Sequence, residues 1–208
     1  GDGATNDSAA IQAAFDYAET VMLNNAVKIV FPAGRYLMNS QAVLTMPGLG
    51  SINLTRYNGV FIEGAGILAS KLIAGADNAD GLIKISVPYE KHCISVTGLQ
   101  LASNLDATVE TTRNNGRALW ITSSNYTESV PSDGLANQPG VILEDLYVGS
   151  DDTDEGDAQV RQGIWGAAAI QLDFQKLPLL SNVTVHVSTD ADASAHASVN
   201  NNAIGIYL

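Results

Sequence analysis

The hydrophobic and polar positions follow two different periods along this chain. Between residues 5 and 23, apolar side chains recur with the spacing of one helix face, at Ile11, Ala14, Phe15, Ala18 and Met22. This stretch opens with side chains suited to an N-cap, namely Thr5, Asp7 and Ser8. The pattern predicts an amphipathic helix, and it is the only convincing helix in the sequence.

Beyond the helix, the period changes to that of β-strands. Short runs rich in Val, Ile and Leu, each bounded by Gly, Asn, Asp or Ser, follow one another to the end of the chain. They include residues 28–31, 59–63, 82–85, 94–96, 119–121, 141–143, 170–172 and 204–206. The sequence therefore predicts an N-terminal cap with the helix at residues 1–26 and an all-β region at residues 27–208.

Two strand patterns alternate strictly from residue 82 onward. The longer pattern aligns on Leu99, Leu146 and Val183, and the shorter one begins at Leu82, Leu119, Ile170 and Ile204. A constant order of strand types with variable spacing is typical of a β-solenoid, because the corners of each coil tolerate extra residues. Three long polar stretches fit as such insertions, at residues 104–116, 123–138 and 150–162.

The end of the sequence bears on the extent of this solenoid. Residues 203–208 open a new coil with the shorter pattern, and no strands follow them. Because solenoids need capped ends, we expect the solenoid to be truncated at its C-terminal end.

Composition and charge narrow the classes of function. With 208 residues, 46% of them hydrophobic, the chain can bury a continuous core. Its 22 acidic and 10 basic residues give a net charge of −12, which argues against nucleic acid as a partner. No apolar run is long enough to span a membrane. Cys93 lies in an apolar run, where we expect a small buried hydrophobe rather than a reactive thiol.

Three motifs carry a resemblance to a known family. The chain opens with Gly-Asp-Gly-Ala-Thr-Asn-Asp-Ser-Ala-Ala-Ile-Gln-Ala-Ala-Phe and continues with Phe31-Pro-Ala-Gly-Arg-Tyr and Val60-Phe-Ile-Glu-Gly-Ala-Gly. These motifs resemble those of the pectate-lyase-like superfamily, which includes polysaccharide lyases, glycoside hydrolases, alginate epimerases and phage tailspikes. The motifs cover residues 1 to about 85, and the rest of the chain resembles the family by repeat pattern. The strand that precedes Gly-Asp-Gly in the family is absent, so we expect truncation at this end too.

The resemblance implies a right-handed parallel β-helix whose N-terminal helix caps the first coil. It also implies an extracellular protein, secreted or on a virion surface, that acts on acidic or neutral glycans in a groove outside the stack. Tailspikes of this shape assemble as homotrimers, which makes a homotrimer the expected assembly. The motif residues are then turn and cap residues rather than catalytic ones: Gly1, Asp2, Gly3, Phe31, Pro32, Gly34, Gly64 and Gly66.

Candidate catalytic residues depend on the reaction. A hydrolase needs two carboxylates, and the candidates on or beside strands of consecutive coils are Glu144, Asp145 and Asp173. Strand spacing of about 4.8 Å would bring them within reach, although alternation sends Glu144 and Asp145 to opposite faces. The alternative is that all three are turn-capping or solvated carboxylates.

A lyase instead needs a base and a cation that neutralises the uronate carboxylate. The available side chains are Arg113, Arg117, Arg161, Lys176 and His186, each of which is otherwise an ordinary surface residue. Arg117 and Arg161 are also candidates for substrate binding.

Aromatic side chains offer flat platforms for sugar rings. The candidates are Trp120, Trp165 and Tyr126. Alternation within Leu119-Trp-Ile places Trp120 on the outer face of its strand, whereas core filling is an equal alternative for Trp165.

The acidic stretch near residue 151 is a candidate Ca²⁺ site, with Asp151, Asp152, Asp154 and Asp157 as ligands. Its spacing fits an EF-hand loop poorly, and a solvated acidic loop is the alternative. No other cofactor is expected.

These observations support three hypotheses. The first is the N-terminal part of an extracellular polysaccharide-degrading β-helix protein, either a tailspike-type depolymerase or a secreted lyase or hydrolase. The second is a non-catalytic glycan-binding or structural β-helix. The third, an assembly or capsid-related protein, requires exposed apolar strips that the sequence does not reveal.

Overall fold

A computed structural model describes residues 1–22, 25–47, 59–75, 78, 80–87, 93–103, 116–123, 140–150, 168–173, 178–185 and 204–207. This part of the chain contains one helix, α1 (Ser8–Met22), and is otherwise almost entirely β. The strands are β1 (Asp2–Asn6), β2 (Val27–Phe31), β3 (Gly34–Met38), β4 (Ala42–Thr45), β5 (Gly59–Gly64), β6 (Ser70–Ala74), β7 (Gly81–Val87), β8 (Cys93–Ser103), β9 (Arg117–Ser123), β10 (Val141–Ser150), β11 (Ala168–Leu172), β12 (Leu179–Val185) and β13 (Ile204–Tyr207).

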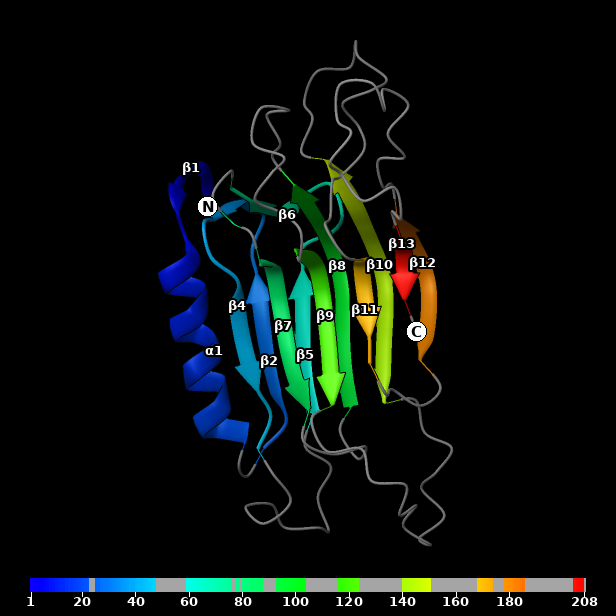
Figure 1. Ribbon diagram of the computed structural model, residues 1–208. Helices are drawn as coiled ribbons and strands as arrows, with labels where there is room; N and C mark the ends of the chain where they lie inside the picture. Colours follow the sequence, from blue (N-terminus) through cyan, green and yellow to red (C-terminus); the bar gives the residue numbers. More distant parts are fainter. Residues whose placement is uncertain are drawn as a thin grey trace, which may run out of the picture.

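The strands form two parallel sheets that lie on either side of the core (Figure 1). In the eight-stranded sheet, β2 pairs with β5 and β3 pairs with β6, and the long strand β8 pairs with both β5 and β6. The five-stranded sheet has the order β4-β7-β9-β11-β13. Consecutive strands therefore stack as sets, for example β2, β3 and β4 on β5, β6 and β7, as the alternating sequence patterns predict.

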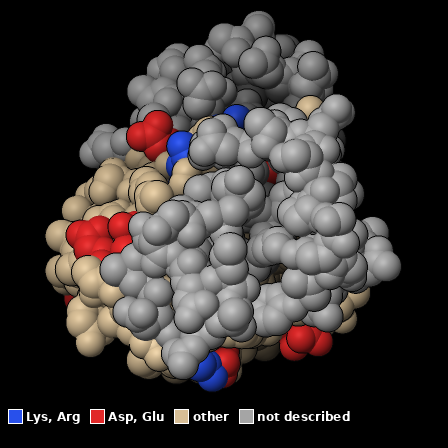
Figure 2. All heavy atoms as spheres, turned by 90° about the horizontal axis from the view of Figure 1, so that it is seen from below, with Lys and Arg blue, Asp and Glu red and all other residues tan. Residues whose placement is uncertain are grey.

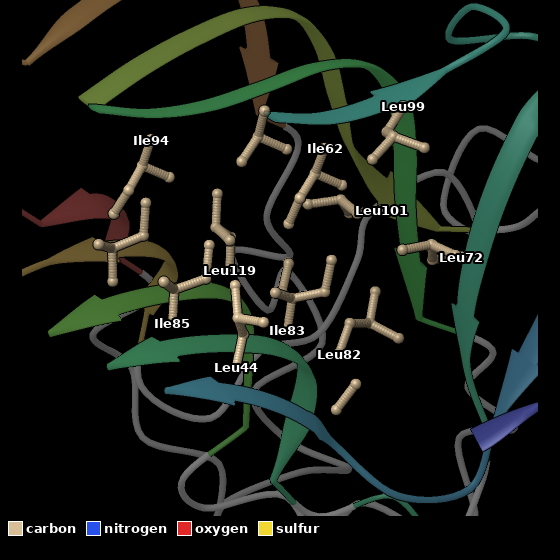
Figure 3. Close-up of a cluster of buried hydrophobic side chains, with 14 of the residues drawn as sticks. Leu44, Ile62, Leu72, Leu82, Ile83, Ile85, Ile94, Leu99, Leu101 and Leu119 are labelled. Carbon is tan, nitrogen blue, oxygen red and sulfur yellow. The ribbon is translucent and has the colours of Figure 1, made fainter. Parts of the chain in front are cut away.

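The long strands of the eight-stranded sheet bend at one level (Figure 3). Gly98 in β8, Asp145 in β10 and Asn182 in β12 have φ angles of 67°, 50° and 50°. Their neighbours in the sequence are paired across the sheet, so the three residues lie side by side. The bend is tightly packed, because a Cβ added to Gly64 would lie 2.2 Å from the carbonyl oxygen of Gly98.

The core lies between the two sheets. Side chains of Ile62, Ile94 and Leu101 point toward Ile83 and Leu119 of the opposite sheet (Figure 3), and all five are fully buried. Burial of each such side chain contributes about 1.5–3 kcal/mol. One continuous apolar cluster runs from the helix to β11, which matches the core expected from the composition.

The helix packs on one end of this core (Figure 1). Ile11, Phe15, Ala18 and Met22 are buried as predicted, whereas Ala14 is exposed. Asp7 occupies the N-cap, since its carbonyl oxygen accepts a hydrogen bond from the Ile11 amide at 3.0 Å.

Two polar side chains of the helix cover the edge of β4. The Gln12 Oε1 atom accepts a hydrogen bond from the Val43 amide, and Gln12 Nε2 donates to the Val43 carbonyl oxygen, both at 2.8 Å. Glu19 accepts a further hydrogen bond from the Thr45 amide at 2.5 Å. Gln12 thus replaces the backbone of a neighbouring strand and blocks an edge that would otherwise pair with another chain.

The opening residues form β1, and the Asp2 side chain closes a local turn within it, a structural role for Asp2 as expected from the sequence. The Asp2 carboxylate accepts hydrogen bonds from the Ala4 amide and from the amide and hydroxyl of Thr5. These bonds favour the ionised form and hold the pKa of Asp2 well below its usual range.

The sheet register tests the two repeat alignments. Leu146 pairs with both Leu99 and Val183, so the longer alignment is confirmed. The shorter alignment is correct between Leu119 and Ile170 and wrong at its ends. Leu119 pairs with Ile83 rather than Leu82, and Ile170 pairs with Ile206 rather than Ile204.

The misalignments have a physical cause. Leu82 follows the left-handed Gly81 at a corner and is buried together with Ile83, so alternation does not separate the two. At β13 the alignment was shifted by two residues, because Ile204 pairs with Ala168 and Ile206 pairs with Ile170. The predicted insertions lie outside the described residues apart from residues 116, 123 and 150.

No helix in the part of the chain that the structure describes is long and apolar enough to cross a membrane.

We predict that Gln12→Ala lowers the free energy of unfolding by about 1–2 kcal/mol, because two hydrogen bonds to β4 are lost. The exposed edge should also increase aggregation, measured by light scattering during urea unfolding. Asp16→Ala is the matched control, since it removes the Gln12–Asp16 hydrogen bond within the helix and leaves β4 untouched. Equal effects of the two substitutions would contradict this role of Gln12.

Candidate functional site

A row of larger side chains runs across the outer face of the five-stranded sheet. Lys84 of β7 pairs in register with Trp120 of β9, which pairs with Gln171 of β11, which pairs with Tyr207 of β13. The sequence neighbours of Trp120 are fully buried, so alternation sends the indole outward, as predicted. Tyr207, at the end of the row, is 50% exposed.

Two cations contact the Trp120 ring. The Lys84 Nζ atom lies 4.1 Å from the ring centroid, and the Arg117 Cζ atom lies 4.2 Å from it. Lys84 approaches from β7, whereas the Arg117 Nε–H group donates a hydrogen bond to Gln171 Oε1 on β11. The indole is therefore held by cation–π contacts with Lys84 of the neighbouring strand β7 and with Arg117 of its own strand β9.

Asp173 follows β11 directly and completes the cluster. Its Oδ2 atom accepts a hydrogen bond from Trp120 Nε1 at 2.6 Å, and its Oδ1 atom accepts one from Gln171 Nε2 at 2.7 Å. The Asp173 backbone amide donates to the Ile121 carbonyl oxygen at 2.8 Å, which fixes the residue beside β9. We call Lys84, Arg117, Trp120, Gln171 and Asp173 the indole cluster.

The indole cluster carries two positive charges and one negative charge. Burial lowers the pKa of Arg117, and the nearby Asp173 carboxylate acts in the opposite direction. The guanidinium stays charged at neutral pH because its usual pKa is so high. The cluster is thus locally positive in a chain with a net charge of −12.

The structure corrects the proposed group of three carboxylates. Glu144 and Asp145 belong to β10 of the eight-stranded sheet, whereas Asp173 lies on the outer face of the other sheet. Consecutive strands β10 and β11 lie on opposite sides of the core, so the chain does not stack these residues on neighbouring strands (Figure 1).

A second correction concerns the alternation at Glu144 and Asp145. Both side chains are exposed rather than on opposite faces, because the left-handed backbone of Asp145 interrupts the extended strand. Asn182 Nδ2 donates a hydrogen bond to Asp145 Oδ1 at 2.6 Å, which links the bends of β10 and β12. The contacts of Asp145 therefore fit the alternative of a turn-capping carboxylate.

Many of the sequence candidates lie outside the described residues. These are the aromatic residues Trp165 and Tyr126, the basic residues Arg113, Arg161, Lys176 and His186, and the candidate calcium ligands Asp151, Asp152, Asp154 and Asp157. Within the described ranges, no group of three or more His, Cys, Asp or Glu side chains is arranged to hold a metal ion. Cys93 is partly buried, and burial raises the pKa of its thiol.

Sequence reasoning missed Lys84 and Gln171. Each lies directly between two apolar residues of its run, as Trp120 does. Alignment by the outward residue, rather than by the first apolar residue, would have placed all three in one row.

No family model, curated protein or solved structure matches the chain. The interpretation of the indole cluster therefore depends on its own geometry.

The left-handed backbone of Asp145 yields a stability prediction. Asp145→Ala should be less stable than Asp145→Gly by about 1 kcal/mol, because a Cβ is unfavourable at this φ angle and glycine has none. The neighbouring Glu144, which lacks a positive φ, is the matched control: there the alanine variant should be the more stable one. Chemical denaturation of the four variants measures both differences, and the same order at both positions would contradict the account.

Proposed function

We propose that this chain belongs to an extracellular, polysaccharide-degrading protein built on a right-handed parallel β-helix. The repeated stacking of β2, β3 and β4 on β5, β6 and β7 supports this architecture, since each group supplies one strand to each successive face. The bends at Gly98, Asp145 and Asn182 supply the corner that divides the larger sheet into two faces.

One observation carries the functional proposal, namely the in-register row Lys84, Trp120, Gln171 and Tyr207. Its members stand on successive strands, about 4.8 Å apart. A polymer that crosses the strands would contact them one after another. An extended chain of sugars, with apolar ring faces and polar edges, suits a row of aromatic, amide and charged groups.

The charges of the indole cluster favour an acidic polysaccharide. Uronate carboxylates accept hydrogen bonds from Lys and Arg side chains, and such charge-assisted bonds are stronger than neutral ones. In Figure 2, which shows the molecule from below, the described carboxylates form separate patches, with basic side chains beside some of them. Because the chain as a whole repels anions, a local pair of cations is needed to hold an anionic polymer.

The same residues favour elimination over hydrolysis as the degradative reaction. Hydrolysis needs two carboxylates that flank the glycosidic oxygen, and among the described members of the cluster Asp173 alone carries one. In elimination, a base removes the proton beside the uronate carboxylate, a C=C bond forms, the glycosidic C–O bond breaks and the leaving oxygen takes up a proton. A cation must neutralise the carboxylate, and Lys84 or Arg117 would supply that cation. A bound Ca²⁺ and a homotrimer remain predictions from the sequence.

The first experiment measures binding and turnover on a panel of capsular, algal and plant polysaccharides. Affinity electrophoresis reports binding, reducing ends report cleavage, and ultraviolet absorbance reports unsaturated uronates. Trp120→Ala should weaken binding to acidic members at least about tenfold, which corresponds to roughly 1.4 kcal/mol. Phe61→Ala is the matched control, because Phe61 is an aromatic residue 38% exposed on the other sheet.

The outcomes separate the hypotheses. Unsaturated products from acidic substrates support elimination, whereas reducing ends without them would replace elimination with hydrolysis. Binding without any product favours the non-catalytic glycan-binding module. Equal effects of Trp120→Ala and Phe61→Ala would contradict the assignment of the indole cluster as the binding site.

A further inference from the structure

The Trp120 ring has a contact that bears on the choice of sugar. Lys84 Nζ reaches the ring from β7 and lies 4.1 Å from its centroid. Arg117 lies over the same ring at 4.2 Å and is held by Gln171. A sugar that stacks on the indole must therefore first displace one of these cations.

The two cations differ in how easily they move. Arg117 starts from the same strand as Trp120, and its hydrogen bond to Gln171 ties it to β11. Gln171 is tied in turn to Asp173. Lys84 reaches the ring through one flexible side chain with four methylene groups, and its ammonium is a compact charge that reorients readily.

We propose that Lys84 is the specificity-determining residue of this site and that it selects acidic over neutral sugars by covering the Trp120 ring. This inference rests on the proposed function. A neutral sugar displaces the ammonium and loses the cation–π contact without replacement. A uronate or sulfated sugar displaces the same ammonium and pairs its anionic group with it, so the lost contact is recovered. Lys84 thus weakens the binding of neutral sugars and strengthens the binding of acidic sugars.

Two substitutions separate the charge of Lys84 from its coverage of the ring. Lys84→Ala removes both, so the affinity for an acidic sugar should fall about tenfold while a neutral sugar gains access to the ring and binds measurably more tightly. Lys84→Met removes the charge and leaves a flexible apolar side chain that still packs on the ring. This variant should lose affinity for the acidic sugar without any gain for the neutral one.

The probes are matched pairs that differ at one group, a carboxylate in the acidic form and a hydroxymethyl group in the neutral form. Polygalacturonate, polymannuronate and hyaluronan are each compared with their carboxyl-reduced, neutral forms by isothermal titration calorimetry. Lys28→Ala is the control variant, because it removes one positive charge from the outer face of β2, where Lys28 pairs with Glu63. It should leave the acidic-to-neutral ratio unchanged. Thermal unfolding of each variant confirms that it is folded.

The outcomes distinguish this inference from the proposed function. If the wild-type protein binds acidic probes and Lys84→Ala keeps the same preference, the selective role of Lys84 is wrong and the binding function stands. If Lys84→Met binds the neutral probes more tightly than the wild type, as Lys84→Ala is expected to do, the claim that Lys84 excludes neutral sugars by covering the ring is wrong. If the wild-type protein binds no member of any pair, both proposals fail together.

Discussion

The structure depends on parallel pairing between equivalent strands of successive repeats. Backbone amides and carbonyls of one strand are satisfied by the strand that follows in the next repeat, so side chains at equivalent positions lie in rows. Inward rows of Ile, Leu and Val make the continuous core between the sheets. The outward row of the five-stranded sheet makes the indole cluster by the same register. At the β4 edge of the five-stranded sheet, as the structure describes it, Gln12 and Glu19 of the helix bond to the backbone of β4.

The bend in the eight-stranded sheet is the second constraint, and it assigns structural roles to polar residues. A left-handed backbone is accessible at low cost only to Gly, Asn and Asp, and these are the residue types at Gly98, Asp145 and Asn182. The hydrogen bond between Asn182 and Asp145 joins adjacent bends. An exposed carboxylate in the middle of a strand therefore has a structural explanation that needs no catalysis.

Much of the fold followed from periodicity. The helix, the strand runs and the pairing of Leu99, Leu146 and Val183 were predictable because burial imposes a strong pattern on long apolar segments. The short strands β3, β4 and β6 were not singled out, and the register at Leu82 was wrong because a corner leaves two successive residues buried. The neighbours of Trp120 were missed because the short strands were aligned on their first apolar residue, whereas the register follows the outward residues Lys84 and Gln171. The expectation that Asp173 would meet Glu144 failed because neighbours in the chain lie on opposite sheets.

The most direct test of the account follows the Trp120 indole N–H group, whose hydrogen bond to Asp173 places it inside the cluster. Two-dimensional ¹⁵N–¹H NMR resolves this resonance, and its absence in Trp120→Phe assigns it. Titration with an acidic oligosaccharide should shift the indole signal together with the backbone amides of Lys84 and Gln171. Shifts confined to the outer face of β10, around Glu144 and Asp145, would contradict the claim that the row on the five-stranded sheet is the ligand-binding surface.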